Sequence, residues 1–583
     1  MNKSGYAAYL IFIFSIIVAA LLGIGMLRDL FRGHYGVDIL AVTAIASTLW
    51  VGEYWATIVI VIMLLGGEAL EQFAQSRAKA ELTALLARAP TKAHKLMVDG
   101  TTRDVPIDSI LRKDNIVVKP GEVIPVDAVV VIGESSLDES SLTGESEQVP
   151  VRAGDQVMSG AINTESPLVL IATNEAGQSQ YARIIELVKA ASDSRAPFVR
   201  MADRYAVPFT FIAFMIAGLA WYTSGDATRF AAVLVVATPC PLLLAAPIAL
   251  ISGMSRAAKH GIIIKNGGVL ERLASVRAAA FDKTGTLTNG ELNFKDLIPA
   301  KGVTPQKLLE YTASAMQASN HAIAQAIMIQ AKAQQSIVHK AIKQKEYPGG
   351  GIRCVVGRDT VLVGRRDFLV DNGVLPSSVP EHSGTAVYVA QNKQYIGMIT
   401  FSDTLRSDSK STIASLTRLG IANIVMLTGD KRVAAQYIAR DLGITEIHAE
   451  CLPVDKVNIV REYSVRPIMM VGDGVNDAPV LAASDVGVAM GARGATAASE
   501  SADVVIMLDS ISRAATAVEI AKRTITVARQ SVLLGIFISI GLMIVAAFGF
   551  VPAIIGALLQ EFVDVAVILN ALRAHKGVYS NAN

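Results

Sequence analysis

The stretch VRAAAFDKTGTLTNGE, from Val276 to Glu291, decides the fold class of the longest polar segment of this chain. Its apolar start is typical of a short buried strand, which ends abruptly at Asp282 before Lys, Thr, Gly and Thr. Helices alternate with buried strands in the rest of the segment, which is the pattern of an open α/β sheet. Because such sheets bind ligands outside the carboxyl ends of their strands, Asp282 is placed to react.

Two more strands end in polar residues that suit the same chemistry. They lie in IVMLTGDK, residues 424–431, and in IMMVGDGVNDAPVL, residues 468–481. Phosphoryl transfer needs a nucleophile, hydrogen-bond donors to the phosphoryl oxygens and Mg²⁺ held by carboxylates. Taken alone, an aspartate at a strand end is more often a helix cap, and GDG is more often a turn. The candidate residues are Thr428, Gly429 and Asp430 in the first stretch, Asp473 and Asp477 in the second, and Lys456 in CLPVDKVNIV as a further positive charge.

The composition indicates a membrane protein with large aqueous parts. The chain has 583 residues, 52% of them of the types AVILMFWYC, and its mean hydropathy is +0.44, which is too apolar for an ordinary soluble protein. The net charge of +2, from 53 basic and 51 acidic residues, gives no electrostatic sign of a nucleic-acid partner. Cys240, Cys354 and Cys451 lie far apart, so neither a disulfide framework nor a structural zinc site is indicated.

Apolar runs long enough for a helix to cross a bilayer, about 20 residues, predict seven spans. The run from Ile39 to Gly67 is broken only by Glu53 and is interpreted as a hairpin of two helices. The run Ala7–Met26 could instead be a signal peptide, but it is longer than the apolar part of a signal peptide and lacks an A-x-A-like cleavage site. The other spans are expected at Ala7–Met26, Tyr205–Tyr222, Phe230–Ser252, Ser531–Phe548 and Val551–Leu572.

Basic residues set the orientation of these spans. Arg28, Arg32, Arg573 and Lys576 flank helix ends, whereas the loops at 223–228 and 549–551 contain no Lys or Arg. By the positive-inside rule the basic ends face the cytosol. We therefore expect an integral protein of the plasma or inner membrane, with both long polar segments in the cytosol.

The first polar segment is typical of a compact all-β domain. In residues 101–135 short β-branched runs alternate with Gly, Pro and Asp, which is the spacing of strands and turns. SLTGESEQVP, residues 141–150, places Thr143, Gly144 and Glu145 in a polar turn. Taken alone, such a turn is most often a solvated loop.

The stretch ATPCPLLLAAP, from Ala237 to Pro247, interrupts a membrane helix. Pro239 and Pro241 leave backbone carbonyls unpaired, which is tolerated in a membrane only where protein or a binding cavity surrounds them. Cys240 lies between the two prolines, and a thiolate selects soft or borderline transition metals. The alternative is a proline kink beside an inert buried cysteine.

Together, DKTGT, TGD, GDGVNDAP and the upstream TGES resemble the P-type ATPases over residues 38–573. The resemblance implies an α-helical transmembrane bundle, an all-β actuator domain, an α/β phosphorylation domain of the haloacid-dehalogenase-like, Rossmann type, and an α+β nucleotide-binding domain. The expected boundaries are 1–75, 204–262 and 526–583 for membrane helices, 76–203 for the actuator, 263–303 and 403–525 for the phosphorylation domain, and 304–402 for the nucleotide-binding domain.

The resemblance also assigns roles to the motif residues. Asp282 would attack the γ-phosphate of ATP and become an aspartyl phosphate, which Glu145 would later help to hydrolyse by orienting water. Asp473 and the Thr284 carbonyl would hold Mg²⁺. The remaining assignments are Asp477 to the Mg²⁺ shell, Thr428 and Lys456 to the phosphoryl oxygens, and Gly429 and Asp430 to the cofactor site.

Several features match the heavy-metal-transporting branch of that family. Its fourth core helix is broken by a Cys-Pro motif, which here is Thr238-Pro239-Cys240-Pro241. Only two membrane helices follow the last phosphorylation motif, and the final one holds Gln560, Glu561 and Asp564. A carboxylate at mid-bilayer costs about 2.5–3.5 kcal/mol unless a cavity or cation accommodates it. The resemblance therefore implies a metal site formed by Cys240, Thr238, Gln560, Glu561 and Asp564, although Glu561 could instead be solvated at the outer interface.

The nucleotide-binding segment departs from the branch's usual pattern. His321 is present, but Ala322 replaces the usual proline and Met316 replaces a glutamate. Arg365 stands where asparagine is common. Gly349, Gly351 and Gly364 match the glycines expected beside the nucleotide phosphates.

The sequence therefore predicts an ATP- and Mg²⁺-dependent exporter of a transition-metal ion. A single thiolate near carboxylates suits divalent Zn²⁺, Cd²⁺, Co²⁺, Ni²⁺ or Fe²⁺ better than copper(I), which remains the alternative cargo. Cys240 argues against potassium or lipid as cargo, because neither needs a thiolate. An alternative of another class is a membrane-anchored phosphohydrolase without transport. The lipid bilayer and the metal ion are the expected partners, and the sequence identifies no protein partner.

Overall fold

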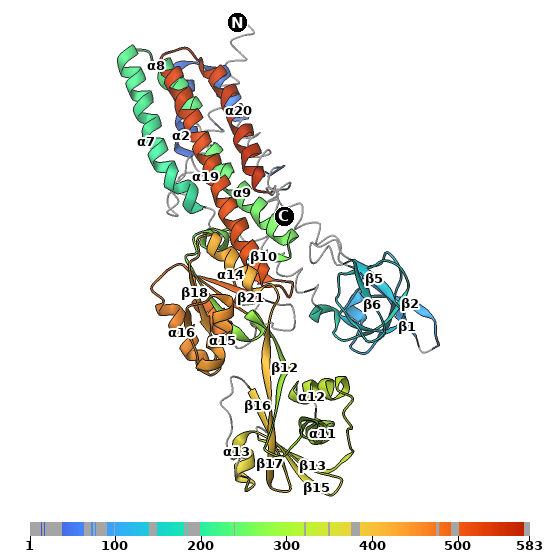
Figure 1. The fold of residues 1–583 in the computed structure, drawn as a ribbon. Helices are drawn as coiled ribbons and strands as arrows, with labels where there is room; N and C mark the ends of the chain where they lie inside the picture. Colours follow the sequence, from blue (N-terminus) through green and yellow to red (C-terminus); the bar gives the residue numbers. More distant parts are fainter. Residues whose placement is uncertain are drawn as a thin grey trace. The chain divides into compact units, whose positions relative to one another are not determined.

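The computed structural model describes residues 38–62, 90–97, 99–138, 148–179, 199–237, 240–319, 322–347, 350–374, 385–473, 477–490 and 501–575, with a few isolated positions besides. The chain divides into two compact units (Figure 1). The first contains residues 1–275, 503–508 and 516–583, and the second contains residues 276–502 and 509–515.

The first unit holds the apolar helices (Figure 1). Within the described residues, three helical segments are long and apolar enough to cross a membrane, at Tyr205–Ser224, Ser512–Ala547 and Ala553–Ala574, and two shorter apolar helices lie at Ile39–Val51 and Ala227–Val236. The run Ala7–Met26, expected to be the first span, lies outside the described residues. The helices are α2 (Asp38–Val51), α7 (Val199–Ser224), α8 (Ala227–Val236), α9 (Cys240–Lys259), α19 (Ser512–Ala547) and α20 (Ala553–Ala571).

The expected hairpin turn lies at Gly52 and Glu53. α2 ends at Val51, and a second helical run follows from Tyr54 to Ile62. Gly52 has a φ of +85°, which a residue without Cβ adopts readily. The Glu53 N–H donates to the Thr48 carbonyl at 2.9 Å and closes the turn.

α19 begins 19 residues before the expected span at Ser531. The stretch from Ser512 to Gln530 contains neither Gly nor Pro and is rich in Ala and Arg, so nothing in it ends a helix. The span predicted at Ser531–Phe548 is therefore the apolar part of a longer continuous helix, because hydropathy marks only the apolar residues of a helix.

The first unit also contains the expected all-β domain. One sheet has the order β2-β1-β3-β9-β4-β7, and a smaller sheet has the order β6-β5-β8. Ile116, Ile124, Leu137, Leu168 and Leu170 are fully buried and form its core. The strands are β1 (Lys92–Leu96), β2 (Thr102–Pro106), β3 (Asn115–Val118), β4 (Ala128–Ile132), β5 (Ser135–Asp138), β6 (Gln148–Val151), β7 (Gln156–Val157), β8 (Ile162–Asn163) and β9 (Leu168–Ala172).

The second unit contains a parallel sheet with helices between its strands. Strands β19, β18, β11, β20 and β21 are neighbours in that order. Every residue of β11, β20 and β21 is buried, as expected where helices cover both faces. The elements are β11 (Ala278–Asp282), α14 (Ser409–Arg418), β18 (Asn423–Leu427), α15 (Arg432–Leu442), β19 (Glu446–His448), α16 (Pro453–Glu462), β20 (Ile468–Gly472), α17 (Ala478–Ala483) and β21 (Val486–Met490).

A second domain is inserted into this α/β domain between two long strands (Figure 1). β12 (Thr288–Pro299) leads into it and β17 (Gln394–Leu405) leads back, and the two strands pair antiparallel. Its six-stranded sheet has the order β12-β17-β16-β15-β14-β13. The other elements are α11 (Pro305–Met316), α12 (Ala322–Ala333), β13 (Ala341–Tyr347), β14 (Gly351–Val356), β15 (Asp359–Gly364), α13 (Arg366–Asp371) and β16 (Thr385–Gln391).

Candidate active site and transport helices

Strand register brings the predicted reactive residues to one edge of the parallel sheet. Asp282, the last residue of β11, pairs with Leu427 at the end of β18, so Thr428 follows at the same level. On the other side Phe281 pairs with Val471 of β20, and Asp473 follows two residues later. Carboxylate oxygens of Asp282, Asp473 and Asp477 all lie within 4.8 Å of one another.

Lys456, near the start of α16, lies between two of these carboxylates. Its Nζ donates hydrogen bonds to Oδ1 of Asp282 and, at 3.2 Å, to Oδ1 of Asp477. Burial lowers the pKa of the Lys456 ammonium, but the charges of Asp282 and Asp477 outweigh burial, so the pKa is raised. Lys456 is therefore a fixed positive charge at the candidate nucleophile.

Burial and the neighbouring charge of Asp477 make Asp282 and Asp473 poor acids. Burial, then the charge of Asp477, raises the pKa of Asp282 to about 7 against the opposing effect of Lys456. The same two causes raise the pKa of Asp473 to about 6. A site with three carboxylates and one ammonium favours an additional cation.

The loop after β11 provides space for this cluster. Gly285 has a φ of +77°, and a Cβ placed on it would lie 1.7 Å from Oδ2 of Asp473. Only glycine fits this close approach. Carboxylate and carbonyl oxygens are the ligands that Mg²⁺ prefers. The residues present therefore fit Mg²⁺, with Asp473, Asp477 and the Thr284 carbonyl as the proposed ligands.

Mg²⁺ is expected to stabilise the protein less at low pH. Because the pKa of Asp282 is raised to about 7 and that of Asp473 to about 6, protons compete with the ion as the pH falls through 7. Protonation of the proposed ligand Asp473, whose pKa is about 6, makes the apparent Mg²⁺ affinity about twofold weaker at pH 6 than at pH 8, and protonation of Asp282 weakens it further by removing a neighbouring negative charge. Melting temperatures in EDTA and in Mg²⁺ at both pH values measure the effect.

The matched variant for this measurement is Asp473→Asn, which removes one proposed ligand. It should show a smaller Mg²⁺-induced rise in melting temperature at pH 8 than the wild type. A rise of equal size at pH 6 and pH 8 in the wild type would exclude these carboxylates as the ion's ligands.

A second charged group lies at the loop that follows Asp282, and it includes Asp403, which the sequence motifs did not predict. Lys283 is 4% exposed, and its Nζ lies 2.6 Å from Oδ2 of Asp430 and 3.3 Å from Oδ2 of Asp403. The Thr288 hydroxyl also donates to Asp403. Asp403 lies in β17, the strand that leads back into the α/β domain, so the contact depends on the inserted domain bringing the chain back.

Arg406 fixes the backbone of the same loop. Its guanidinium donates to the carbonyl oxygens of Gly285 at 2.7 Å and Thr288 at 3.2 Å, and it forms an ion pair with Asp509 at 2.7 Å. The only sequence signal for Asp403 and Arg406 is the polar run SDTLR at the end of β17. We regard Arg406 as a positioning residue, since it holds the loop that carries the candidate nucleophile.

Thr428 and Asp430 form a tight turn after β18. Thr428 is 1% exposed, and its Oγ1 accepts a hydrogen bond from the Asp430 N–H at 3.1 Å. The hydroxyl proton of Thr428 therefore remains available for donation to a phosphoryl oxygen. A Cβ at Gly429 would lie 3.4 Å from the Cys451 carbonyl, so this turn packs closely against the loop before α16.

The inserted domain contains a cavity of about 330 Å³ beside two of the predicted nucleotide-site glycines. Gly351 and Gly364 are paired across β14 and β15. A Cβ on Gly351 would lie 2.3 Å from the Val363 carbonyl, so no larger residue fits there without a shift of the backbone. His321 and Gly349, also predicted for this site, lie outside the described residues.

The break expected at the Thr-Pro-Cys-Pro stretch appears in the backbone. α8 ends at Val236, where the Ala237 N–H donates to the Val233 and Leu234 carbonyls, and a new helix, α9, begins at Cys240. Thr238 and the Cys240 side chain lie outside the described part of the chain, as does Glu145 of the all-β domain. The run predicted as one span, Phe230–Ser252, is therefore two helices.

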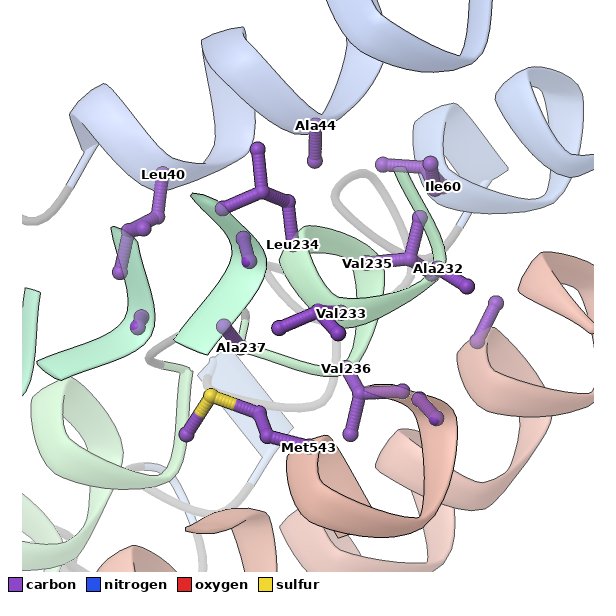
Figure 2. Close-up of a cluster of buried hydrophobic side chains, with 14 of the residues drawn as sticks. Leu40, Ala44, Ile60, Ala232, Val233, Leu234, Val235, Val236, Ala237 and Met543 are labelled. Carbon is purple, nitrogen blue, oxygen red and sulfur yellow. The ribbon is translucent and has the colours of Figure 1, made fainter. Parts of the chain in front are cut away.

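α20 packs against both sides of this break. Gly556 lies so close to α8 that a Cβ on it would be 2.7 Å from Val236 Cγ2. About three to four turns further along, Ile568 and Ala571 pack with Ile248 and Ala249 of α9. Figure 2 shows the end of α8, with Val236 and Ala237, packed in the apolar cluster between α2 and Met543 of α19.

Two of the three candidate metal-binding residues of α20 lie in this packed interior. Gln560 is 0% exposed and Asp564 3% exposed, and Gln560 Nε2 donates to Asp564 Oδ1 at 3.3 Å. Since both lie on α20 between its contacts with α8 and with α9, they lie at the level of the break. Glu561 is only half-buried and lies on the neighbouring face of the helix.

Gly556→Leu is expected to destabilise the helix bundle by about 1–3 kcal/mol, because a larger side chain must push α20 away from Val236. Gly541→Leu is the matched control on α19, since a Cβ there has no atom within 4 Å. Thermal unfolding in detergent compares the two variants. Equal melting temperatures would show that α20 does not pack closely against α8.

Two family models match the chain in the domains that carry these sites. The model of the P-type ATPase actuator domain matches residues 87–189. The model of haloacid dehalogenase-like hydrolases matches residues 276–485. The α/β class predicted from the sequence is thereby confirmed.

Relatives of similar architecture match almost the whole chain. A zinc-transporting ATPase of Synechocystis is 34% identical over 570 residues, which cover 94% of this chain and 78% of the relative. A cadmium, zinc and cobalt-transporting ATPase of Helicobacter pylori is 34% identical, with 94% and 82% covered. A copper-exporting P-type ATPase of Bacillus subtilis is 35% identical, with 90% and 68% covered.

A solved structure matches the whole architecture. The crystal structure of a zinc-transporting PIB-type ATPase in an E2.Pi state aligns with a TM-score of 0.66 at 31% identity, covering 98% of this chain and 96% of that chain.

Proposed function

We infer the function from one premise: the chain belongs to the heavy-metal-transporting branch of the P-type ATPases. We propose that it hydrolyses ATP at Asp282 and uses the energy to export a divalent transition-metal ion across the membrane. The observation that carries the proposal is the meeting of Asp282, Lys456, Asp473 and Asp477 at one sheet edge.

In the first half of the proposed reaction, Asp282 is the nucleophile. A carboxylate oxygen of Asp282 forms a bond to the γ-phosphorus, the bond from that phosphorus to the β–γ bridging oxygen breaks, and ADP leaves with the electron pair. Lys456 and the Thr428 hydroxyl donate to the phosphoryl oxygens. Mg²⁺ bound by Asp473, Asp477 and the Thr284 carbonyl would neutralise phosphate charge.

In the second half, water removes the phosphoryl group. Glu145 accepts a proton from the water, the water oxygen bonds to phosphorus, and the carboxylate of Asp282 leaves to give inorganic phosphate. We place Glu145 in this role because it lies in the TGES motif of a domain that matches the actuator model.

The metal ion is proposed to bind where α8 and α9 separate. The donors would be Cys240 and Thr238 at the break, with Asp564 and Gln560 from the facing turns of α20 and Glu561 beside them. One thiolate with carboxylate and amide oxygens suits Zn²⁺, Cd²⁺ or Co²⁺. The relatives named above include transporters of these three metals, and copper(I) is the second candidate because a copper exporter is equally similar.

The orientation of the chain in the membrane follows from the same reaction scheme. ATP is cytosolic, so the all-β domain, the α/β domain and the inserted domain are proposed to face the cytosol, and the metal leaves on the opposite side.

The test is ATP hydrolysis by the purified protein in lipid vesicles across a panel of metals. We expect stimulation by Zn²⁺, Cd²⁺ or Co²⁺, accompanied by ATP-dependent accumulation of that metal inside inverted vesicles. Stimulation by copper(I) alone would select the second candidate. Hydrolysis that no transition metal stimulates would favour a membrane-anchored phosphohydrolase.

A further inference from the structure

The cavity of the inserted domain has a charged rim that the nucleotide motifs do not account for. Among the fourteen described residues that line it, Glu346 is the one carboxylate and Arg365 the one cation. Glu346 is on β13, the edge strand of the sheet, and Arg365 directly follows β15. The two charges therefore come from different strands that approach one cavity.

The floor of the cavity is apolar and partly formed by backbone. Met316, Ile352, Val363 and Val387 are each at most 6% exposed and line it. Beside them the paired glycines Gly351 and Gly364 present no side chain. A surface of this kind accommodates a flat heteroaromatic ring, which needs apolar contact on its faces and polar partners only at its edge.

Glu346 is positioned to be such an edge partner. Its side chain is exposed, and its Oε1 accepts a hydrogen bond of 3.4 Å from the hydroxyl of Ser319, which follows α11 and also lines the cavity. Ionised carboxylates only accept hydrogen bonds. The partner of Glu346 on a bound ring must therefore be a donor, such as an exocyclic amine.

We propose that Glu346 accepts a hydrogen bond from the 6-amino group of adenine and so selects ATP over GTP. The proposal rests on the proposed function for the assumption that a nucleoside triphosphate occupies this cavity. Guanine carries an oxygen at the same ring position, and this oxygen would face the carboxylate without a proton between them. Such a mismatch is costly, because two acceptors lose their water and gain no partner.

The same charges set the direction of the nucleotide. A triphosphate is repelled by Glu346 and attracted by Arg365, so the base lies at the β13 side and the phosphates lie toward Arg365. Arg365 occupies the position where asparagine is common in the heavy-metal-transporting branch. Glu346 and Arg365 therefore act as a pair that orients the ligand.

The experiment measures nucleotide binding to the full chain by displacement of a fluorescent ATP analogue, without Mg²⁺ so that no nucleotide is consumed. The competing nucleotides are ATP, GTP and purine riboside triphosphate, which lacks the 6-amino group. In the wild type we expect purine riboside triphosphate to bind about tenfold more weakly than ATP, because it loses one hydrogen bond to a charged group. In Glu346→Ala this ratio should fall to about one.

Glu346→Gln gives a second, independent readout. Its amide can donate to the oxygen of guanine, so GTP should bind more tightly to this variant than to the wild type. Glu310→Gln is the control, since Glu310 lies in the same domain but pairs with His339 outside the cavity. Each comparison is a ratio within one protein, which cancels a general change in affinity caused by the altered charge.

An unchanged ratio of ATP to purine riboside triphosphate affinity in Glu346→Ala would overturn the proposal, as would a failure of Glu346→Gln to gain affinity for GTP. Phosphorylation of Asp282 is measured on the same preparations. Loss of base selectivity in Glu346→Ala with intact phosphorylation of Asp282 supports the role of Glu346. A wild type that never becomes phosphorylated contradicts the proposed function instead.

Discussion

Asp282→Asn is expected to abolish ATP hydrolysis while leaving the protein at least as stable as the wild type. The amide of asparagine cannot form an acyl phosphate under these conditions, so the covalent route is closed, and loss of a nucleophile lowers turnover by about 10⁴-fold or more. Phosphate release by the purified protein measures the first effect, and its melting temperature in EDTA measures the second.

The stability half of this prediction follows from the charges around Asp282. Its pKa is raised to about 7 by burial and by Asp477, so at pH 8 the ionised side chain is in an unfavourable environment. Asparagine removes that cost, and Lys456 keeps its contact with Asp477 at 3.2 Å. Asp441→Asn, at an exposed position on α15, is the control and should change neither quantity. A marked fall in melting temperature for Asp282→Asn would mean that this carboxylate stabilises the fold rather than serving chemistry.

Cys240→Ala is expected to remove stimulation of ATP hydrolysis by transition metals. The backbone break places Cys240 at the first position of α9, and Gln560 and Asp564 lie on α20, the helix that packs against both α8 and α9. Without the thiolate, the remaining oxygen donors have little preference for soft or borderline metals over Mg²⁺ and Ca²⁺. We expect the apparent affinity for the exported metal to fall at least about 100-fold, beyond the range in which stimulation is measurable.

Cys354→Ala is the matched control, because Cys354 is a buried thiol of the inserted domain and lies far along the chain from the transport helices. It should lower stability slightly and leave stimulation by metals intact. Stimulation that survives Cys240→Ala would place the ion site elsewhere in the bundle. Loss of stimulation in both variants would point to general damage rather than to a metal ligand.

The active-site edge was predictable from sequence because parallel strands end together. Asp282, Thr428 and Asp473 each follow a short buried run, and the register of β11, β18 and β20 aligns those ends. The sequence did not predict that Lys456 hydrogen-bonds to both Asp282 and Asp477, because Lys456 and Asp282 are 174 residues apart in the chain. Such a contact depends on where α16 packs.

The contact of Lys283 with Asp403 could not be predicted from the sequence either. Asp403 is 120 residues from Lys283, and the two meet only because β12 and β17 pair and return the chain to its starting point. Nothing in the spacing of these residues predicts that meeting. By contrast, the break before Cys240 was predictable, because proline forbids a continuous helix through local geometry alone.

Membrane helices were predictable in place but not in length. The hairpin turn at Glu53 and the helix at Val551–Leu572 were confirmed to within a few residues. The helix of the span predicted at Ser531–Phe548 begins earlier, at Ser512, because a polar helical stretch leads into the apolar run without interruption. Hydropathy detects contact with lipid, whereas helix ends are set by caps and by residues that break helices.

The most direct test of the account is trapping of the phosphorylated protein with radiolabelled γ-phosphate of ATP. We predict acid-stable, hydroxylamine-sensitive label on the peptide that contains Asp282, with the amount of label changed by the exported metal in the wild type and not in Cys240→Ala. Absence of label from that peptide under every metal condition would contradict the central claim that Asp282 is the phosphorylated residue of a metal-driven cycle.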